Sequence, residues 1–245
     1  MKDNFSVQAA AYAAFRPHYP QELYDFLYSL PIPKDTAWDC ATGNGQVAAV
    51  LAKVYKKVYA SDISAAQLQH APKLPNISYL TCPAESTPIP DKSIDLVTVA
   101  QAVHWFQFDK FNQEVRRMLR PHGWLAIWGY GLLQTDDEGL NNLIQQFYAH
   151  TLGPYWDAER RYIDEKYTSI PFPFKETTTP ELNIAVDWTR QQFLGYLSSW
   201  SSVQHYLRQN GESPIPAFEG LLQNRWPSDK SIGLRFPVFM QLGQV

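Results

Sequence analysis

The stretch Thr36-Ala-Trp-Asp39-Cys-Ala41-Thr-Gly43-Asn-Gly45, followed after a short interval by Val58-Tyr-Ala-Ser-Asp62, decides the fold. A short apolar run ends in an acid, and a loop of small residues follows at once. The loop opens a predicted helix, because its apolar residues have the i, i+3, i+4, i+7 spacing of one buried face. These residues are Val47, Val50, Leu51 and Val54. A second strand then ends at Asp62. The stretch predicts a β–loop–α–β unit with a carboxylate at each strand end.

The glycine loop suits a cofactor that contains adenosine. Gly43-Asn-Gly45-Gln-Val-Ala48 fits the dinucleotide pattern G-x-G-x-x-A, and Asp62 lies near the ~20-residue spacing of a ribose-binding acid. An NAD-dependent dehydrogenase is therefore one reading. However, Asp39 precedes the glycines, where its charge would repel a pyrophosphate. An acid at this position suits a ligand that presents an ammonium group.

Composition excludes several functional classes. A net charge of −3 over 245 residues gives no basic surface for nucleic acid, and no apolar run approaches the ~20 residues that span a bilayer. The N-terminus lacks a signal-peptide pattern, and Cys40 and Cys82 are expected to be reduced packing residues without a metal. We therefore expect a cytoplasmic protein, a monomer or weak dimer, without nucleic-acid, membrane or metal partners.

Strands alternate with helices along the first half of the chain. Further strands are predicted at 77–81, 94–100 and 124–128, and the apolar residues of the helix before the last of these run from Phe108 to Leu119. We expect an α/β fold with a doubly wound, mostly parallel seven-stranded sheet. One domain over 1–245 would contain an N-terminal helical arm (1–35), a cofactor-binding core (36–131), a cover with C-terminal helices (132–230) and a last strand (231–245).

The second half carries capping signals and an aromatic segment. Capping boxes are predicted to begin at Thr135 and Thr189, as at Ser64 in the first half. Residues 153–180 are rich in proline and aromatics without a clear period, and we interpret them as an ordered cover that forms the substrate pocket. If the substrate is an acid, at least one arginine of the cover region should point inward. The candidates are Arg160, Arg161, Arg190 and Arg225.

The pattern resembles class I S-adenosylmethionine-dependent methyltransferases over most of the chain. Asp39-x-Ala41-x-Gly43-x-Gly45 resembles their acidic glycine loop, although Ala41 stands where the first glycine is usual. Tyr12-x-x-x-Arg16-Pro-x-Tyr19-Pro and Gln101-Ala-Val-His104-Trp105-Phe106 resemble the small-molecule group that includes trans-aconitate methyltransferase-type enzymes. Pro83 replaces an acid that many relatives use to bond the adenine.

The resemblance implies a set of site residues. Asp62 would bind the ribose, Ile63 would lie against the adenine, and Arg16 would pair with the cofactor carboxylate. The residues implied for S-adenosyl-L-methionine are Tyr12, Arg16, Asp39, Ala41, Thr42, Gly43, Gly45, Asp62, Ile63, Gln67, Ala84, Glu85, Ala100 and Gln101. The substrate pocket would contain Tyr19, His104 and Trp105, with His104 as the candidate base.

The resemblance implies methyl transfer to a small molecule, with O-methylation of a carboxylic acid as the preferred reaction. Such an acceptor is already nucleophilic at neutral pH and needs no base. Two alternatives stay open at this point: a protein that binds S-adenosylmethionine as a regulator without turnover, and the NAD-dependent dehydrogenase.

Overall fold

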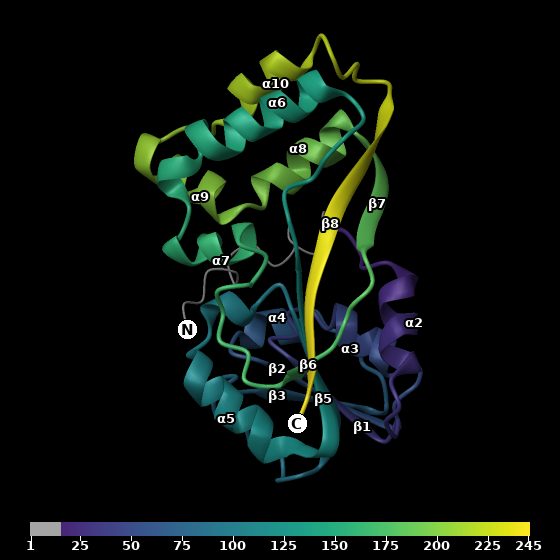
Figure 1. Ribbon diagram of the computed structural model, residues 1–245. Helices are drawn as coiled ribbons and strands as arrows, with labels where there is room; N and C mark the ends of the chain where they lie inside the picture. The colour runs from purple at the N-terminus through teal and green to yellow at the C-terminus, as the bar shows by residue number, and fades with distance from the viewer. Residues whose placement is uncertain (1–15) are drawn as a thin grey trace.

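The computed structural model describes residues 16–245, so Tyr12 lies outside the described residues. Within 16–245 the chain forms one eight-stranded sheet of order β3-β2-β1-β4-β5-β8-β6, with β7 paired to β8 (Figure 1). The strands are β1 (Thr36–Cys40), β2 (Lys57–Asp62), β3 (Ile77–Thr81), β4 (Ile94–Ala100), β5 (Leu119–Tyr130), β6 (Lys175–Glu176), β7 (Leu182–Thr189) and β8 (Ser231–Gln244). The longer helices are α2 (Gln21–Ser29), α3 (Gln46–Leu51), α5 (Phe108–Met118), α6 (Glu138–Gln146), α8 (Arg190–Ser198), α9 (Ser201–Asn210) and α10 (Ile215–Leu222).

The first five strands are parallel and confirm the doubly wound arrangement. β1 pairs with β2 on one side and with β4 on the other, β2 pairs with β3, and β4 pairs with β5. The order of the strands reverses between β1 and β4. In open α/β sheets, ligands bind outside the carboxyl ends of the strands at such a reversal.

The antiparallel edge explains why the sheet has eight strands and not the predicted seven. Val238 of β8 pairs with Tyr130 of β5 on one side and with Leu182 of β7 on the other. β6 pairs with the opposite end of β8, at Gly243 and Gln244. β6 and β7 therefore share the seventh position of the sheet.

Pro237 is accommodated inside β8 because β5 ends one residue short of it. The Pro237 carbonyl accepts a hydrogen bond from Gly131 N at 2.9 Å, so its nitrogen also faces the β5 side. The last residue pair between β5 and β8 is Tyr130 with Val238. The N–H that Pro237 lacks would have pointed toward β5, so the proline removes no hydrogen bond between β7 and β8.

Alternate residues of β5 face two different layers. Trp124, Ala126 and Trp128 belong to a core with α2 and α3, whereas Leu125 and Ile127 belong to a core with α5. Both faces of the sheet are thus covered, as the continuous apolar strands predicted.

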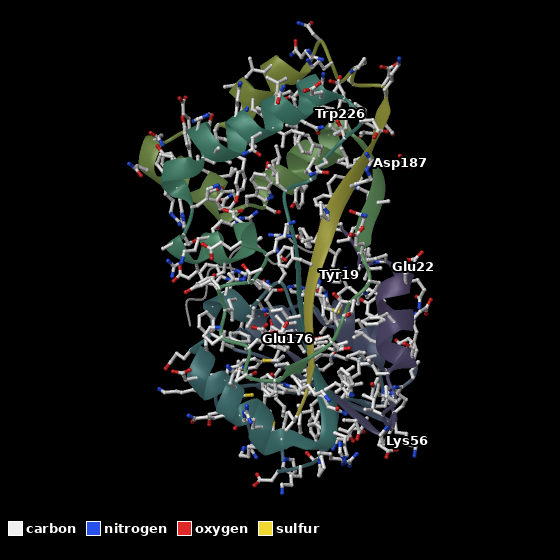
Figure 2. All side chains as sticks on the ribbon, viewed as in Figure 1. Tyr19, Glu22, Lys56, Glu176, Asp187 and Trp226 are labelled. Atoms are coloured by element: carbon white, nitrogen blue, oxygen red, sulfur yellow. The ribbon has the colours of Figure 1, made fainter. Side chains whose placement is uncertain are left out.

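A third core lies in a helical cap, by which we mean α6, α8, α9 and α10. The cap stands above the parallel half of the sheet and packs on β7 and the first half of β8, which extends through both parts of the molecule (Figure 1). Phe193 stacks on Trp226 with ring centroids 5.1 Å apart, and Trp226 lies at the far end of the cap (Figure 2). Among residues 16–245, no helix is both long and apolar enough to cross a lipid bilayer.

Several local predictions can be compared with these elements. Ser64 and Thr189 cap their helices as predicted, and Thr189 forms the full capping box. The prediction for Thr135 was wrong: Asp137 caps α6 through its side chain, because Thr135 instead bonds the backbone of Asp137. Two residues that were predicted on buried helix faces lie outside their helices. α3 ends before Val54, which is 40% exposed, and Leu119 is the first residue of β5.

Candidate functional site

The loop after β1 turns through three residues with left-handed backbone. Ala41, Gly43 and Gly45 have φ values of +54°, +56° and +78°. A Cβ on Gly43 would meet no atom within 4 Å, whereas a Cβ on Gly45 would lie 2.9 Å from the Tyr79 hydroxyl. A side chain at Gly45 would be crowded, whereas Gly43 has open space beside it, and the positive φ favours glycine at both positions.

Asp39, the acid at the end of β1, is buried and held by three donors. Its Oδ1 accepts a hydrogen bond from Thr98 Oγ1 at 2.9 Å, and its Oδ2 accepts from Ala48 N at 3.1 Å and from Thr42 Oγ1. Burial raises the pKa of Asp39 from 3.8 to about 6, against the opposing effect of these hydrogen bonds. A cation that reached this carboxylate would favour its ionised form.

Asp62, the acid at the end of β2, joins the β1 loop to the start of α4 (Ala65–Gln69). Its Oδ2 accepts from Gly43 N at 2.9 Å, and its Oδ1 accepts from Ser64 N at 2.8 Å. Two backbone N–H groups, one from the β1 loop and one from the start of α4, therefore orient the carboxylate.

Gln101, immediately after β4, ties the end of that strand to β5. Its backbone is left-handed, with φ +55°. Gln101 N donates to Trp128 O at 2.8 Å, and Gln101 Oε1 accepts from Tyr130 N at 2.8 Å. The side-chain amide thus continues the β4–β5 ladder past the strand end. Tyr130 in turn accepts a 2.6 Å hydrogen bond at its hydroxyl from Arg16.

These strand ends enclose a solvent-open hollow of about 600 Å³, which we call the first hollow. Its lining residues are Arg16, Pro17, Tyr19, Asp39, Ala41, Thr42, Gly43, Asn44, Gln46, Val47, Ala100, Gln101 and Tyr130. Tyr19 lies between the parallel sheet and the cap, edge-on to Trp128 (Figure 2). The first hollow lies where the strand order reverses.

A second hollow of about 530 Å³ lies beside the first and shares Arg16 and Gln101 with it. It lies between the segment after β4 and the cap. Its lining residues are Arg16, Gln101, His104, Trp105, Trp156, Asp157, Arg160, Ile163, Trp200 and Ser201. A molecule in the second hollow would meet one in the first hollow at the Arg16–Gln101 boundary.

His104, in the short helix η2 (Val103–Trp105), is neutral at ordinary pH. Burial, and then the positive charge of Arg160, lowers its pKa from 6.5 to about 3. His104 Nδ1 lies 3.0 Å from the Tyr167 hydroxyl. A ring with this pKa is a weak base, so the geometry suits a hydrogen-bonding role better than proton abstraction.

Seven of the predicted cofactor residues line the first hollow: Arg16, Asp39, Ala41, Thr42, Gly43, Ala100 and Gln101. Asp62 touches this group through Gly43 N. The remaining predicted residues, Gly45, Ile63, Gln67, Ala84 and Glu85, do not line the first hollow; Ala84 is buried, and Glu85 Oε1 accepts from Gln107 N. Of the predicted substrate residues, His104 and Trp105 line the second hollow, whereas Tyr19 lines the first.

Of the four candidate arginines, Arg160 lines the second hollow. Arg161 lies on the surface beside Tyr162, Arg190 donates to Trp226 O, and Arg225 pairs with Asp137. Sequence reasoning missed Tyr130, Trp200 and Ser201. Tyr130 carried no signal beyond its place two residues after the strand predicted at 124–128.

Residues 16–245 contain no group of three or more His, Cys, Asp or Glu side chains arranged to bind a metal ion. Cys40 and Cys82 are both free thiols, and Cys40 is buried. Burial raises the pKa of the Cys40 thiol.

Known proteins share this sequence and fold. Residues 38–127 match the model of a family described as a methyltransferase domain. A Dictyostelium discoideum protein named as a methyltransferase is 34% identical over 99% of this chain and 95% of its own length. A Saccharomyces cerevisiae protein named as S-adenosylmethionine-dependent is 26% identical over 86% of this chain and 84% of its own. A solved structure of a type II methyltransferase from Anaeromyxobacter dehalogenans has a TM-score of 0.87 and 34% identity, covering 94% of this chain and 98% of that one.

Proposed function

Because the chain belongs to the class I S-adenosylmethionine-dependent methyltransferases, we propose that its acceptor is a small carboxylic acid bound in the second hollow. The observation that carries this proposal is the shared boundary of the two hollows at Arg16 and Gln101. Among the described residues, the boundary at which an acceptor would meet the cofactor includes an arginine, and arginine binds carboxylates in a fixed, bidentate geometry.

The residues of the first hollow fit the cofactor. Asp39 offers a buried carboxylate for an ammonium group, and Gly43 presents open backbone. Asp62 offers oriented oxygens for a ribose diol. We propose the full predicted set as cofactor-binding residues: Tyr12, Arg16, Asp39, Ala41, Thr42, Gly43, Gly45, Asp62, Ile63, Gln67, Ala84, Glu85, Ala100 and Gln101. The NAD reading is set aside, because Asp39 would face the pyrophosphate.

The proposed mechanism depends on positioning. When bound, S-adenosylmethionine supplies an electrophilic methyl group, and transfer to a carboxylate oxygen breaks the C–S bond with its electron pair left on sulfur. Arg16 lines both hollows, so in this proposal its guanidinium lies between the carboxylate of the cofactor and that of the acceptor. Gln101 orients the acceptor at the boundary, and His104 and Trp105 wall it from water. Alignment of this kind can lower the barrier by several kcal/mol, with an upper range of about 7–11 kcal/mol. An ionised acid needs no proton removed, which agrees with a His104 pKa of about 3.

The test is turnover against a panel of small carboxylic acids, with methyl ester formation followed by mass spectrometry. We expect esters from at least one acid and no product from the matched amides. Tight cofactor binding without any ester, or methylation of amines and phenols alone, would show that the acceptor is not an acid. Location in the cytoplasm and a monomeric or weakly dimeric state stay predictions.

A further inference from the structure

The two ring nitrogens of His104 have different surroundings. Nδ1 lies 3.0 Å from the hydroxyl of Tyr167, a residue that is fully buried. Nε2 has no hydrogen-bond partner among residues 16–245, and it is not one of the buried polar atoms that are left without a partner. Because the ring lines the second hollow, Nε2 is the nitrogen that is open to it.

The His104 ring carries a single proton, so one of its nitrogens donates and the other accepts. Burial, and then the positive charge of Arg160, lowers the pKa of His104 to about 3 and keeps the ring neutral. In a neutral imidazole, the hydrogen bond that one nitrogen makes decides which of the two is protonated. The state of Nε2 in the hollow is therefore decided at Nδ1, by Tyr167.

Tyr167 is the better donor of this pair. A phenol gives up its proton more readily than a neutral imidazole N–H does, and an imidazole nitrogen accepts a hydrogen bond more strongly than a phenol oxygen. The favoured arrangement has the Tyr167 hydroxyl donating to His104 Nδ1. Nε2 then carries the proton of the ring and presents an N–H group to the second hollow.

The chain reaches Tyr167 through an unusual turn. α7 (Arg161–Asp164) is followed by two hydrogen bonds, from Tyr167 N to Tyr162 O at 2.7 Å and from Lys166 N to Ile163 O at 2.9 Å. These are the two bonds of a Schellman motif, in which the left-handed residue is usually glycine. Here Lys166 and Tyr167 both have left-handed backbone, with φ +51° and +63°.

This backbone is strained, and the core around Tyr167 holds it in place. Left-handed conformation in a bulky residue costs conformational energy, and such strain is concentrated at functional sites. The Tyr167 ring packs edge-on against Phe239, with ring centroids 5.0 Å apart. The hydroxyl of Tyr167 is thereby fixed against Nδ1 of His104.

We infer that Tyr167 is a positioning residue that holds His104 in the tautomer protonated at Nε2, so that His104 gives the second hollow a hydrogen-bond donor and not a base. Tyr167 lines neither hollow, so it acts through His104. The use of this donor rests on the proposed function, because an acceptor in the second hollow is what would place an oxygen against Nε2.

Nitrogen-15 NMR of the histidine rings tests the tautomer directly. The protein is labelled at its six histidines and measured at neutral pH, and the signals of His104 are those that disappear in His104→Asn. We expect a pyrrole-type shift, that of a protonated nitrogen, at Nε2 and a pyridine-type shift at Nδ1. The reverse pattern, or two protonated nitrogens, overturns the inference, and this measurement needs no variant of Tyr167.

Two tyrosines of the same segment provide a matched comparison. Tyr167→Phe removes one hydroxyl and keeps the ring against Phe239, so the Nδ1 signal should move to that of a pyridine-type nitrogen without a hydrogen bond, or an Nδ1–H form should appear beside it. Tyr162→Phe, which removes a hydroxyl that accepts from Arg161, should leave both His104 signals unchanged. No change in Tyr167→Phe, or an equal change in both variants, overturns the role of Tyr167. Far-UV circular dichroism shows whether each variant is folded.

Two replacements of His104 separate this inference from the proposed function. The amide of glutamine reaches the position of Nε2, whereas that of asparagine reaches the position of Nδ1. On an acid that the enzyme methylates, we expect His104→Gln to change KM by less than about threefold and His104→Asn to raise it by about tenfold, as for one lost hydrogen bond. Equal losses in the two variants overturn the use of the Nε2 donor. If no acid is methylated, the proposed function fails, and the NMR pattern still decides the tautomer.

Discussion

Replacement of Asp39 by asparagine should make the protein more stable at neutral pH and weaken its binding of the cofactor. The substitution is well accommodated by the hydrogen bonds. The new carbonyl oxygen can accept from Thr42 and Ala48 as Oδ2 does now. The new amide can donate to Thr98 Oγ1, which can turn its own proton to Trp38 O, 3.4 Å away. The main change is therefore the loss of a buried charge.

The magnitude follows from the raised pKa of Asp39. The folded protein binds the Asp39 proton up to about pH 6, whereas the unfolded chain releases it near 3.8. Between these values the folded state holds more protons, so this carboxyl reduces stability as the pH rises, and the loss is complete above about pH 6. The difference corresponds to about 3 kcal/mol at pH 7.5 and to almost nothing near pH 4. We expect Asp39→Asn to raise the free energy of unfolding at pH 7.5 by about 1–3 kcal/mol, because the buried amide has its own desolvation cost.

Urea unfolding of both proteins between pH 4 and 8, without cofactor, measures this effect. His104 acts in the opposite direction: its pKa is lowered to about 3, so the stability it contributes is present above 6.5 and is lost as the pH falls. His104 is the same in both proteins, so its effect cancels in their difference. A variant less stable than the natural protein at pH 7.5, or a difference that does not change with pH, would refute the reasoning.

The same variant tests the assignment of Asp39 to the cofactor. A charge-assisted hydrogen bond to an ammonium group contributes about 1.5–3 kcal/mol, which is about tenfold to hundredfold in affinity. We expect calorimetry with S-adenosylmethionine to show a loss of this size in Asp39→Asn. If the variant is more stable and binds S-adenosylmethionine with full affinity, the Asp39 carboxylate does not contact the cofactor.

Three further predictions concern other parts of the site. The natural enzyme should show no change of kcat with pH near 6.5 from His104, because its pKa is about 3; an inflection there that vanishes in His104→Asn would contradict this. Ala41→Gly should raise the unfolding free energy in urea by up to ~1 kcal/mol, because Ala41 has φ +54°; a loss of stability would argue against strain. Gly129→Ala should cost about 1–3 kcal/mol, because the new Cβ would lie 2.7 Å from the Phe239 ring. Gly220→Ala, with open space around it, should not lower the unfolding free energy and serves as its control.

The parallel half of the fold was predictable because its signals are local. Asp39, Gly43 and Asp62 each stand at or just after the end of an apolar run, and parallel strands bring their carboxyl ends to one edge. Ala100 and Gln101, which the family resemblance implied, line the same hollow as this loop; their binding of the cofactor stays a prediction. The edge of the sheet was less predictable, since a two-residue strand such as β6 has no sequence period.

The sequence predicted which segment forms the substrate pocket, but not which side chains meet there. Trp105, Trp156 and Trp200 come from three separate segments, and their convergence depends on how the cap lies on β8. Nothing in the pattern of residues 153–180 distinguishes Arg160 from Arg161. The distinction comes from the π-helical turn η3 (Phe147–Thr151), which brings the Tyr148 hydroxyl to Nε of Arg160.

The charges in the two hollows bear on the reaction. The first hollow contains Asp39 with Asp62 close by, and the second contains Arg160 and Asp157, with Arg16 at the boundary. Methyl transfer to a carboxylate removes one positive charge from the sulfonium and one negative charge from the acceptor. A reaction that cancels charge is favoured where water is excluded, because the reactants lose more solvation than the transition state does. Arg16 faces a neutral ester after transfer, so the product should bind less tightly than the acid. Product inhibition by the methyl ester of the acceptor should therefore be weaker than competition by the parent acid.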